Sequence, residues 1–139
     1  CASVLIDLDG GATGSFVVSQ VSPGRKNRLW VEVDGSEGAL AWDQDHPDEL
    51  WHGHRGRPNQ LLPRDPALLD VESLVGSFLP AGHPEGWSDA LRNLFAEIYG
   101  FIRAGKSPVR DAPTYPTFYD GLVENALVEA ILESYRLQQ

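Results

Sequence analysis

Apolar residues alternate with polar ones in short runs throughout the first half of the chain, and this pattern limits the fold more than any other feature. Successive side chains of a β-strand point to opposite faces, so a period of two indicates strands. Turn signals such as Asp9-Gly10-Gly11 separate the runs. Connections this short join antiparallel neighbours, because parallel neighbours need long crossovers. The pattern predicts strands over residues 4–8, 14–21, 29–34, 39–43, 50–54 and 60–62.

The second half of the chain changes to helical spacing. One helix is expected to begin near Trp87 and to end at Ala104-Gly105, and a second is expected over residues 118–137. Strands followed by helices predict an α+β fold, with an open-faced, mostly antiparallel sheet of about five or six strands and two long helices on one face. The apolar stripe of the first helix is interpreted as core that packs on the sheet; it consists of Leu91, Leu94, Phe95 and Ile98.

The opposite face of the predicted sheet also carries apolar side chains. Trp30, for example, lies between Leu29 and Val31, so both faces of that strand are apolar. An uncovered apolar face usually marks an interface. We therefore expect a homo-oligomer, such as a dimer, that forms when two open sheet faces stack.

Length and charge exclude several classes of function. The 139 residues suit a single domain, 1–139. With 11 Lys and Arg against 20 Asp and Glu, the net charge is −9, which predicts no binding to nucleic acid or to anionic membranes. The sequence has no apolar run of about 20 residues, so a cytoplasmic protein is expected. The absence of Met and the apolar opening at residues 2–6 predict a fragment of a longer protein.

Two aspartates near the start allow a different interpretation. Residues 4–11 form an apolar run that ends in Asp7-Leu8-Asp9-Gly10, and this resembles the aspartate loop of haloacid-dehalogenase-type phosphatases. That resemblance implies a Mg²⁺-dependent phosphatase using Asp7 and Asp9. The phosphatase needs a helix after the loop, whereas this sequence predicts a strand. The alternative, a hairpin turn with two solvated aspartates, is therefore favoured.

Other motifs give weak indications. Residues 10–14 are rich in glycine but lead into a strand, so they do not form a dinucleotide loop. His52 and His54 share a strand face, but no third ligand is specified, so no metal site is predicted. Cys1 is the single cysteine, so it can form neither an internal disulfide nor a cysteine zinc site.

The segment at the start of the first long helix is the most informative. It contains His83, Glu85, Trp87 and Asp89 within about two turns. Acidic residues suit the positive end of a helix dipole, so capping explains part of this pattern. An imidazole can also bind a hydroxyl group, and an indole offers an apolar wall to a sugar ring.

The run Gly-His-Pro-Glu-Gly-Trp-Ser-Asp-Ala-Leu-Arg-Asn-Leu-Phe at 82–95 resembles the C-terminal domain of the glucose–fructose oxidoreductase/inositol dehydrogenase (Gfo/Idh/MocA) family. Residues 30–40 are similar to the hairpin of that family, and residues 116–122 are similar to the start of its last helix. The resemblance extends over nearly the whole chain, in the same order.

The resemblance implies an N-terminal Rossmann domain that binds NAD or NADP and is absent from this chain, in an enzyme that oxidises or reduces a sugar or polyol. This sequence contains neither the Glu-Lys-Pro motif nor the Asp-x-x-x-His pair of the family. We therefore expect no catalytic residues, no cofactor and no metal in this chain. It would bind substrate through His83 as a hydroxyl contact and Trp87 as a pocket wall, supported by Glu85 or Asp89. The alternative is a stand-alone interaction module of the same fold.

Overall fold

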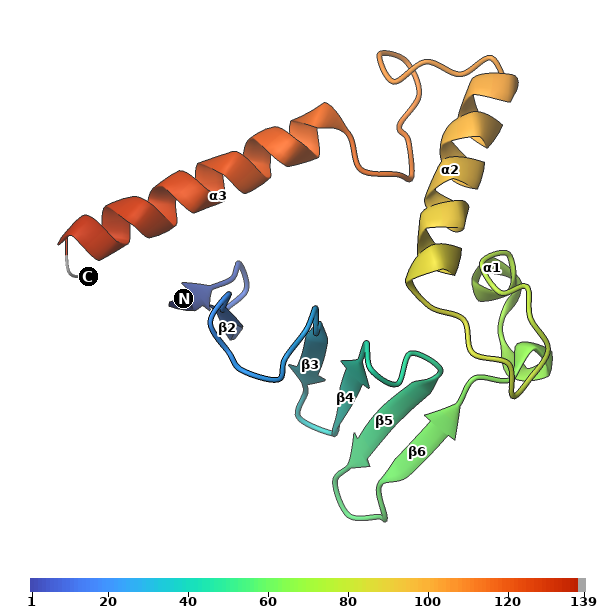
Figure 1. The fold of residues 1–139 in the computed structure, drawn as a ribbon, viewed down its shortest axis with the longest axis horizontal. Helices are drawn as coiled ribbons and strands as arrows, with labels where there is room; N and C mark the ends of the chain where they lie inside the picture. The colour runs from blue at the N-terminus through green and yellow to red at the C-terminus, as the bar shows by residue number, and fades with distance from the viewer. Residues whose placement is uncertain (138–139) are drawn as a thin grey trace. The chain divides into compact units, whose positions relative to one another are not determined.

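The computed structural model describes residues 1–137 and has the α+β class predicted from the order of strands and helices (Figure 1). The strands are β1 (Ala2–Asp7), β2 (Thr13–Val18), β3 (Trp30–Asp34), β4 (Gly38–Asp43), β5 (Glu49–His54) and β6 (Gln60–Pro63). The helices are the 3₁₀ turn η1 (Pro66–Leu68), α1 (Val71–Leu74), α2 (Trp87–Arg103) and α3 (Phe118–Leu137).

The chain divides into two compact units. One unit combines Cys1–Arg25 with the segment that begins at Pro116, and the other is Lys26–Tyr115. In the first unit, β1 and β2 form an antiparallel hairpin in which Val4 pairs with Phe16. Its turn is closed by a hydrogen bond from the Leu8 amide to the Ala12 carbonyl, at 2.8 Å. The same unit contains α3.

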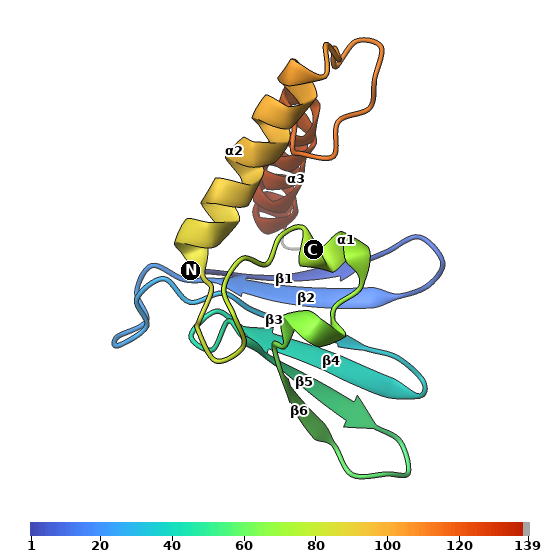
Figure 2. The same cartoon turned by 90° about the vertical axis from the view of Figure 1, so that its right-hand side faces the viewer.

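The second unit contains a four-stranded antiparallel sheet in the order β3-β4-β5-β6 (Figure 2). The six predicted strands are therefore all present, but they are divided between two sheets. Strand β2 ends at Val18, before the predicted residue 21. There the Ser19 hydroxyl accepts a hydrogen bond from the Val21 amide, so the chain turns instead of extending the ladder.

The two faces of the four-stranded sheet follow from its register. Ala41 pairs with Trp51, and Trp51 pairs with Leu61, so these three side chains share what we call the open face. Leu50 pairs with Leu62 on the other side. We call that side the loop face, because the loop before α2 is hydrogen-bonded to Asp48 and Arg64 at its end.

Two short helices, η1 and α1, were not predicted. Asp65 caps the first by accepting from the Ala67 amide, and Asp70 caps the second by accepting from the Ser73 amide. Each spans about one turn, which is too short to show a helical period in the sequence.

The two long helices are present where the spacing predicted them, but the prediction that the apolar stripe of α2 is core packed on the sheet is wrong. Leu91 and Phe95 are exposed, Phe95 by 49%, whereas Leu94 and Ile98 are half-buried. Among residues 1–137 no hydrophobic side chain is fully buried. Most contacts between elements join neighbouring strands, and a single layer cannot bury both of its own faces. The placement of both helices on one sheet face involves both units and stays a prediction.

None of the helices in the described part combines the length and the apolar character needed to cross a bilayer.

Candidate functional site

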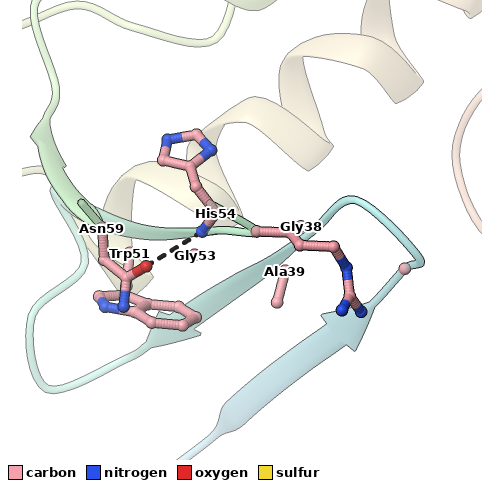
Figure 3. A pocket seen from close by; sticks show the side chains of 8 residues that line it. Gly38, Ala39, Trp51, Gly53, His54 and Asn59 are labelled. Carbon is pink, nitrogen blue, oxygen red and sulfur yellow. Dashed lines mark hydrogen bonds between the residues drawn. The ribbon is translucent and has the colours of Figure 1, made fainter. Parts of the chain in front are cut away.

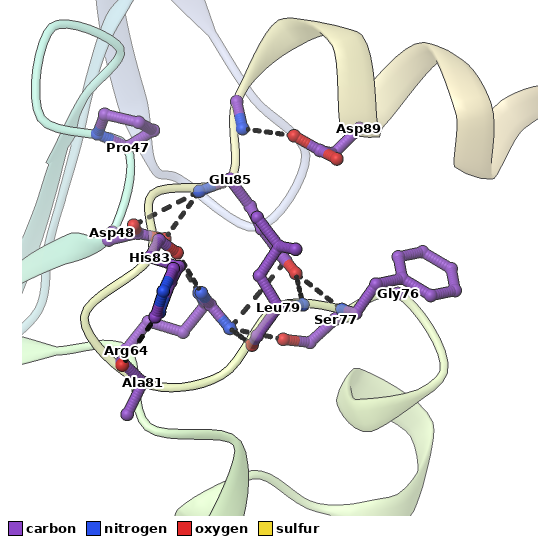
Figure 4. Close-up of polar contacts among 12 residues, drawn as sticks. Pro47, Asp48, Arg64, Gly76, Ser77, Leu79, Ala81, His83, Glu85 and Asp89 are labelled. Atoms are coloured by element: carbon purple, nitrogen blue, oxygen red, sulfur yellow. Dashed lines mark hydrogen bonds and ion pairs between the residues drawn. The ribbon is translucent and has the colours of Figure 1, made fainter.

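The predicted site residues lie in and after the loop over residues 77–86, which leads into α2; Figure 4 shows His83, Glu85 and Asp89 among them. The His83 amide donates to the Pro80 carbonyl at 3.1 Å, which forms a turn in this loop. Gly82 has a φ of 79°, a left-handed conformation that glycine adopts without steric cost. The loop then passes through Glu85 into the first turn of α2.

Asp89 stabilises the start of α2. Its Oδ2 accepts a hydrogen bond from the Gly86 amide at 2.9 Å, while the Asp89 and Ala90 amides donate to the Gly86 carbonyl, each at 3.0 Å. A carboxylate at this position also lies at the positive end of the helix dipole. The capping interpretation of this residue is therefore confirmed.

Glu85 is bonded to the loop itself. Its carboxylate is only 11% exposed. Oε1 accepts from the amide of Phe78 at 2.5 Å and also from the amide of Leu79. Buried carboxylates need such donors, because their loss of water must be offset. Glu85 thus joins the two ends of the loop.

Arg64 is the centre of this polar network, and sequence reasoning did not find it. Its Nε lies 2.7 Å from Asp48 Oδ1, and its Nη1 lies 3.8 Å from Glu85 Oε2. The hydrogen bond with Asp48 is the main cause that raises the pKa of the Arg64 guanidinium above its usual value. Three further bonds reach the loop: Nη1 donates to the Ser77 hydroxyl at 2.5 Å and to the Leu79 carbonyl at 3.1 Å, and Nη2 donates to the His83 carbonyl at 2.7 Å.

Asp48 completes the network from the neighbouring strand. It directly precedes β5, and Arg64 directly follows β6. Glu49 pairs with Pro63, and the Arg64 amide donates to the Asp48 carbonyl at 2.7 Å, so the ladder continues by one step. The Asp48 carboxylate also accepts from the Glu85 amide at 3.2 Å. The one sequence signal that could have located this pair is the antiparallel pairing of the predicted strands 50–54 and 60–62, because Asp48 and Arg64 each lie two residues beyond one of them.

The other two predicted residues keep their polar or aromatic groups exposed. The His83 imidazole lies at the surface, with Nδ1 3.4 Å from the Ala81 carbonyl. Trp87 is the first residue of α2 and is 69% exposed. The structure therefore separates the four residues into two groups: His83 and Trp87 are accessible to a ligand, while Glu85 and Asp89 bind backbone amides.

The histidines of β5 form a separate cluster. The rings of His52 and His54 have centroids 3.9 Å apart, and His54 Nε2 lies 2.9 Å from the Gln60 side-chain oxygen. Burial, with a contribution from the charge of His54, lowers the pKa of His52. Within residues 1–137 no three His, Cys, Asp or Glu side chains gather closely enough to hold a metal ion.

A shallow hollow of about 360 Å³ lies at the end of the four-stranded sheet, away from the predicted site (Figure 3). Trp51 and Ala39 line it from the face opposite to the His54 imidazole, as Figure 3 shows, and Asn59 and Arg55 border it. This hollow contains none of the four predicted site residues.

The aspartates of the phosphatase alternative lie in the β1–β2 hairpin. Asp7 is the last residue of β1 and pairs with Thr13, and Asp9 lies in the turn. The loop is followed by strand β2, whereas the phosphatase would need a helix at this point.

Comparisons with known proteins agree on one class of enzyme. A Bacillus subtilis protein named as an uncharacterized oxidoreductase, YfiI, is 31% identical over 97 residues, which are 70% of this chain and 25% of that protein. A solved oxidoreductase from Sinorhizobium meliloti is 35% identical, with a TM-score of 0.82. The match covers 96% of this chain and 37% of the Sinorhizobium meliloti chain. An inositol dehydrogenase homologue from Azotobacter vinelandii, solved with NADH and myo-inositol, is 28% identical, with a TM-score of 0.83 over 96% of this chain and 36% of that one.

No family model matches the chain. The chain spans about a quarter of the curated relative and little more than a third of the solved structures. These structural neighbours are thus an oxidoreductase and an inositol dehydrogenase homologue, each considerably longer than the chain.

Proposed function

We propose that this chain is the C-terminal substrate-binding and oligomerisation domain of an NAD(P)-dependent oxidoreductase of the Gfo/Idh/MocA family that acts on a sugar or polyol. The observation that carries the proposal is the match of 96% of the chain to the Azotobacter vinelandii protein that binds NADH and myo-inositol. That match has 28% sequence identity, so it supports more than a shared fold.

The geometry supports a role in substrate binding. His83 presents an exposed imidazole, and Trp87 presents an exposed indole at the start of the same helix. An imidazole exchanges hydrogen bonds with hydroxyl groups, and an indole face covers the C–H surface of a sugar ring. Glu85 and Asp89 support these two residues by holding the loop and the first turn of α2.

The chemical step belongs to the rest of the proposed enzyme. Hydride transfer requires a nicotinamide cofactor and an acid–base group at the reacting carbinol. We propose that an N-terminal Rossmann domain supplies both and that this domain is the partner of the chain, in a cytoplasmic enzyme. Residues of this chain would orient the substrate, which is a separate contribution to the rate.

We further propose that the chain self-associates through the open face. Alternation places the side chains of Asp48, Leu50, Leu62 and Arg64 on the loop face, and the loop before α2 is bonded to Asp48 and Arg64. The open face, with Trp51 and Leu61, is thus the side turned away from that loop. Sheets of this kind stack with aligned strands in many oligomers.

Two alternatives have less support. A stand-alone interaction module would share the fold. It would not account for the similarity of the chain to a protein that binds myo-inositol. The phosphatase alternative lacks the helix that its loop requires, because β2 follows Asp9 instead.

The proposal is tested with the full-length protein that contains this chain. We expect it to reduce NAD⁺ or NADP⁺ in the presence of myo-inositol or another cyclic polyol or sugar, measured by the absorbance of the reduced cofactor. His83→Ala should raise the KM for that substrate about tenfold, since it removes one hydrogen bond to a hydroxyl group.

His46→Ala is the matched control, because His46 is an exposed histidine of the same unit that lies outside the loop. It should leave KM unchanged. The proposal would be wrong if no sugar or polyol supported reduction of either cofactor. An equal effect of the two histidine variants would contradict the role of His83.

A further inference from the structure

We propose that Arg64 is a positioning residue that sets where His83 presents its imidazole. This inference rests on the proposed role of His83 as a substrate contact. Arg64 itself has no place in that contact, because its guanidinium bonds are all directed to Asp48, Glu85 and the backbone or hydroxyl groups of the loop.

The bonds of Arg64 reach three separate points of the loop. The guanidinium donates to Ser77 and Leu79 near the start of the loop, and to the His83 carbonyl next to the imidazole (Figure 4). The last bond, at 2.7 Å, holds the peptide to which the His83 side chain is attached. A shift of this carbonyl therefore moves the imidazole with it.

Arg64 is in turn held by the sheet. Asp48 Oδ1 accepts a hydrogen bond from Arg64 Nε at 2.7 Å. The Arg64 amide donates to the Asp48 carbonyl and so continues the β5–β6 ladder. The side chain of Arg64 is only 13% exposed, so water competes little for these bonds. The loop is thus held at the strand ends by two side chains, Arg64 and Asp48, of which Arg64 makes the bond next to the imidazole.

The planar fork of arginine matters for this arrangement. It presents donors in fixed directions, so it can bind the Asp48 carboxylate on one side and several loop acceptors on the other. A lysine ammonium keeps the positive charge, but it is a single centre and cannot reach all of these acceptors. Arg64→Lys therefore separates the geometry of this network from its charge.

The test uses the full-length protein, Arg64→Lys and the matched control Arg28→Lys. Arg28 binds Asp43 through Nε at 3.1 Å and through Nη2, as a fork of the same kind, but its bonds are directed to Asp43 and Asp45 and not to the loop. Arg64→Lys should raise the KM for myo-inositol, or for the polyol found active, about tenfold while kcat changes less than about twofold. Arg28→Lys should change neither quantity.

Hydrogen exchange supplies a second measurement that does not depend on the reaction. The amides of Phe78 and Leu79, which donate to Glu85, should exchange about tenfold faster in Arg64→Lys than in the parent protein, because the loop opens more often. Arg28→Lys should leave their exchange unchanged.

The outcomes separate this inference from the proposed function. Faster exchange with an unchanged KM would overturn the positioning role, and so would a fall in kcat at constant KM. If the full-length protein acted on no polyol or sugar, the proposed function would fail, and the role of Arg64 toward His83 would fail with it. Unchanged exchange in an active enzyme would overturn the inference alone.

If Arg64→Lys does not fold, Ser77→Ala is the second variant, because it removes one acceptor of the same guanidinium. It is expected to raise KM and the exchange rate of the Phe78 and Leu79 amides by a smaller factor.

Discussion

Among single residues, the two arginine–aspartate pairs of the four-stranded sheet show how surroundings change the role of the same contact. Arg28 binds Asp43 at a strand end where both side chains are about a quarter to a third exposed. Arg64 binds Asp48 where the arginine is largely shielded and has further acceptors. Exposed ion pairs of this kind contribute little to stability. The main effect of the Arg28–Asp43 pair is therefore on the pKa of Asp43.

The Asp43 carboxyl gives the first prediction at this scale. The hydrogen bond from Arg28 is the main cause that lowers its pKa from 3.8 to about 2. The unfolded chain thus binds this proton more readily, so the contribution of Asp43 to stability is complete above pH 3.8 and is lost as the pH falls toward about 2. An NMR titration of the carboxyl carbon should show a midpoint near this lower value.

Arg28→Gln is the matching variant, and it should return the midpoint of Asp43 toward 3.8. A midpoint that stays low in this variant would show that the Asp45 amide, which also donates to Asp43, is the larger cause.

At this scale the sequence singled out four residues of the candidate site, and their role in binding stays a prediction. The spacing of His83, Glu85, Trp87 and Asp89 within one short segment made them visible, because neighbours in sequence are neighbours in space. Asp48 and Arg64 lie 37 and 21 positions before Glu85 in the numbering, and only the β5–β6 register brings them to the loop. Pairwise spacing along the chain does not contain that information.

Among the elements, α2 depends on its first turn. Gly86 precedes the helix and has no side chain to cap it, so Asp89 supplies the bond that holds the Gly86 amide. Asp89→Ala should lower the free energy of unfolding by about 1 kcal/mol, as the loss of a helix-capping side chain does elsewhere. Urea denaturation followed by circular dichroism measures this change.

Ser88→Ala is the control for that measurement, because Ser88 is an exposed residue of the same turn. It should change the free energy of unfolding by less than about 0.5 kcal/mol. A loss in Asp89→Ala no larger than the loss in Ser88→Ala would contradict the capping role.

Strands and long helices were predictable because each has a period that its residues repeat. The alternation over residues 29–34 predicted the strand that the structure contains as β3. The spacing of Trp87, Leu91 and Leu94 predicted the helix α2. The division of the six strands into two sheets was not predictable, because alternation reveals which residues share a face of one strand but not which strands pair.

For the whole molecule, the main feature is the amount of apolar surface that the chain leaves uncovered. Leu61 on the open face is 58% exposed, and Trp30 and Phe95 are about half exposed. The periodicity of the sequence shows which positions are apolar, but it cannot show whether another element covers them. For this reason the spacing predicts a core stripe on α2, whereas none of its residues is buried in the structure.

Self-association through the open face can be tested by placing a charged side chain on that face. Leu61→Lys should weaken association at least tenfold in analytical ultracentrifugation, because two facing sheets would have to bury an ammonium group. Leu68→Lys is the control, since Leu68 is 84% exposed but lies in η1, outside the sheet. Association that is unaffected by Leu61→Lys, or equally weakened by Leu68→Lys, would contradict an interface on this face.

The β5–β6 hairpin has one more consequence. Its turn, where Gly56 has a φ of 88° and Asn59 accepts from the His54 amide, lies at the end of the ladder opposite to Arg64. A slip of one residue there would carry the guanidinium to the other side of the sheet. Insertions or deletions in this remote turn would therefore remove Arg64 from the loop that contains His83 without changing any residue of that loop.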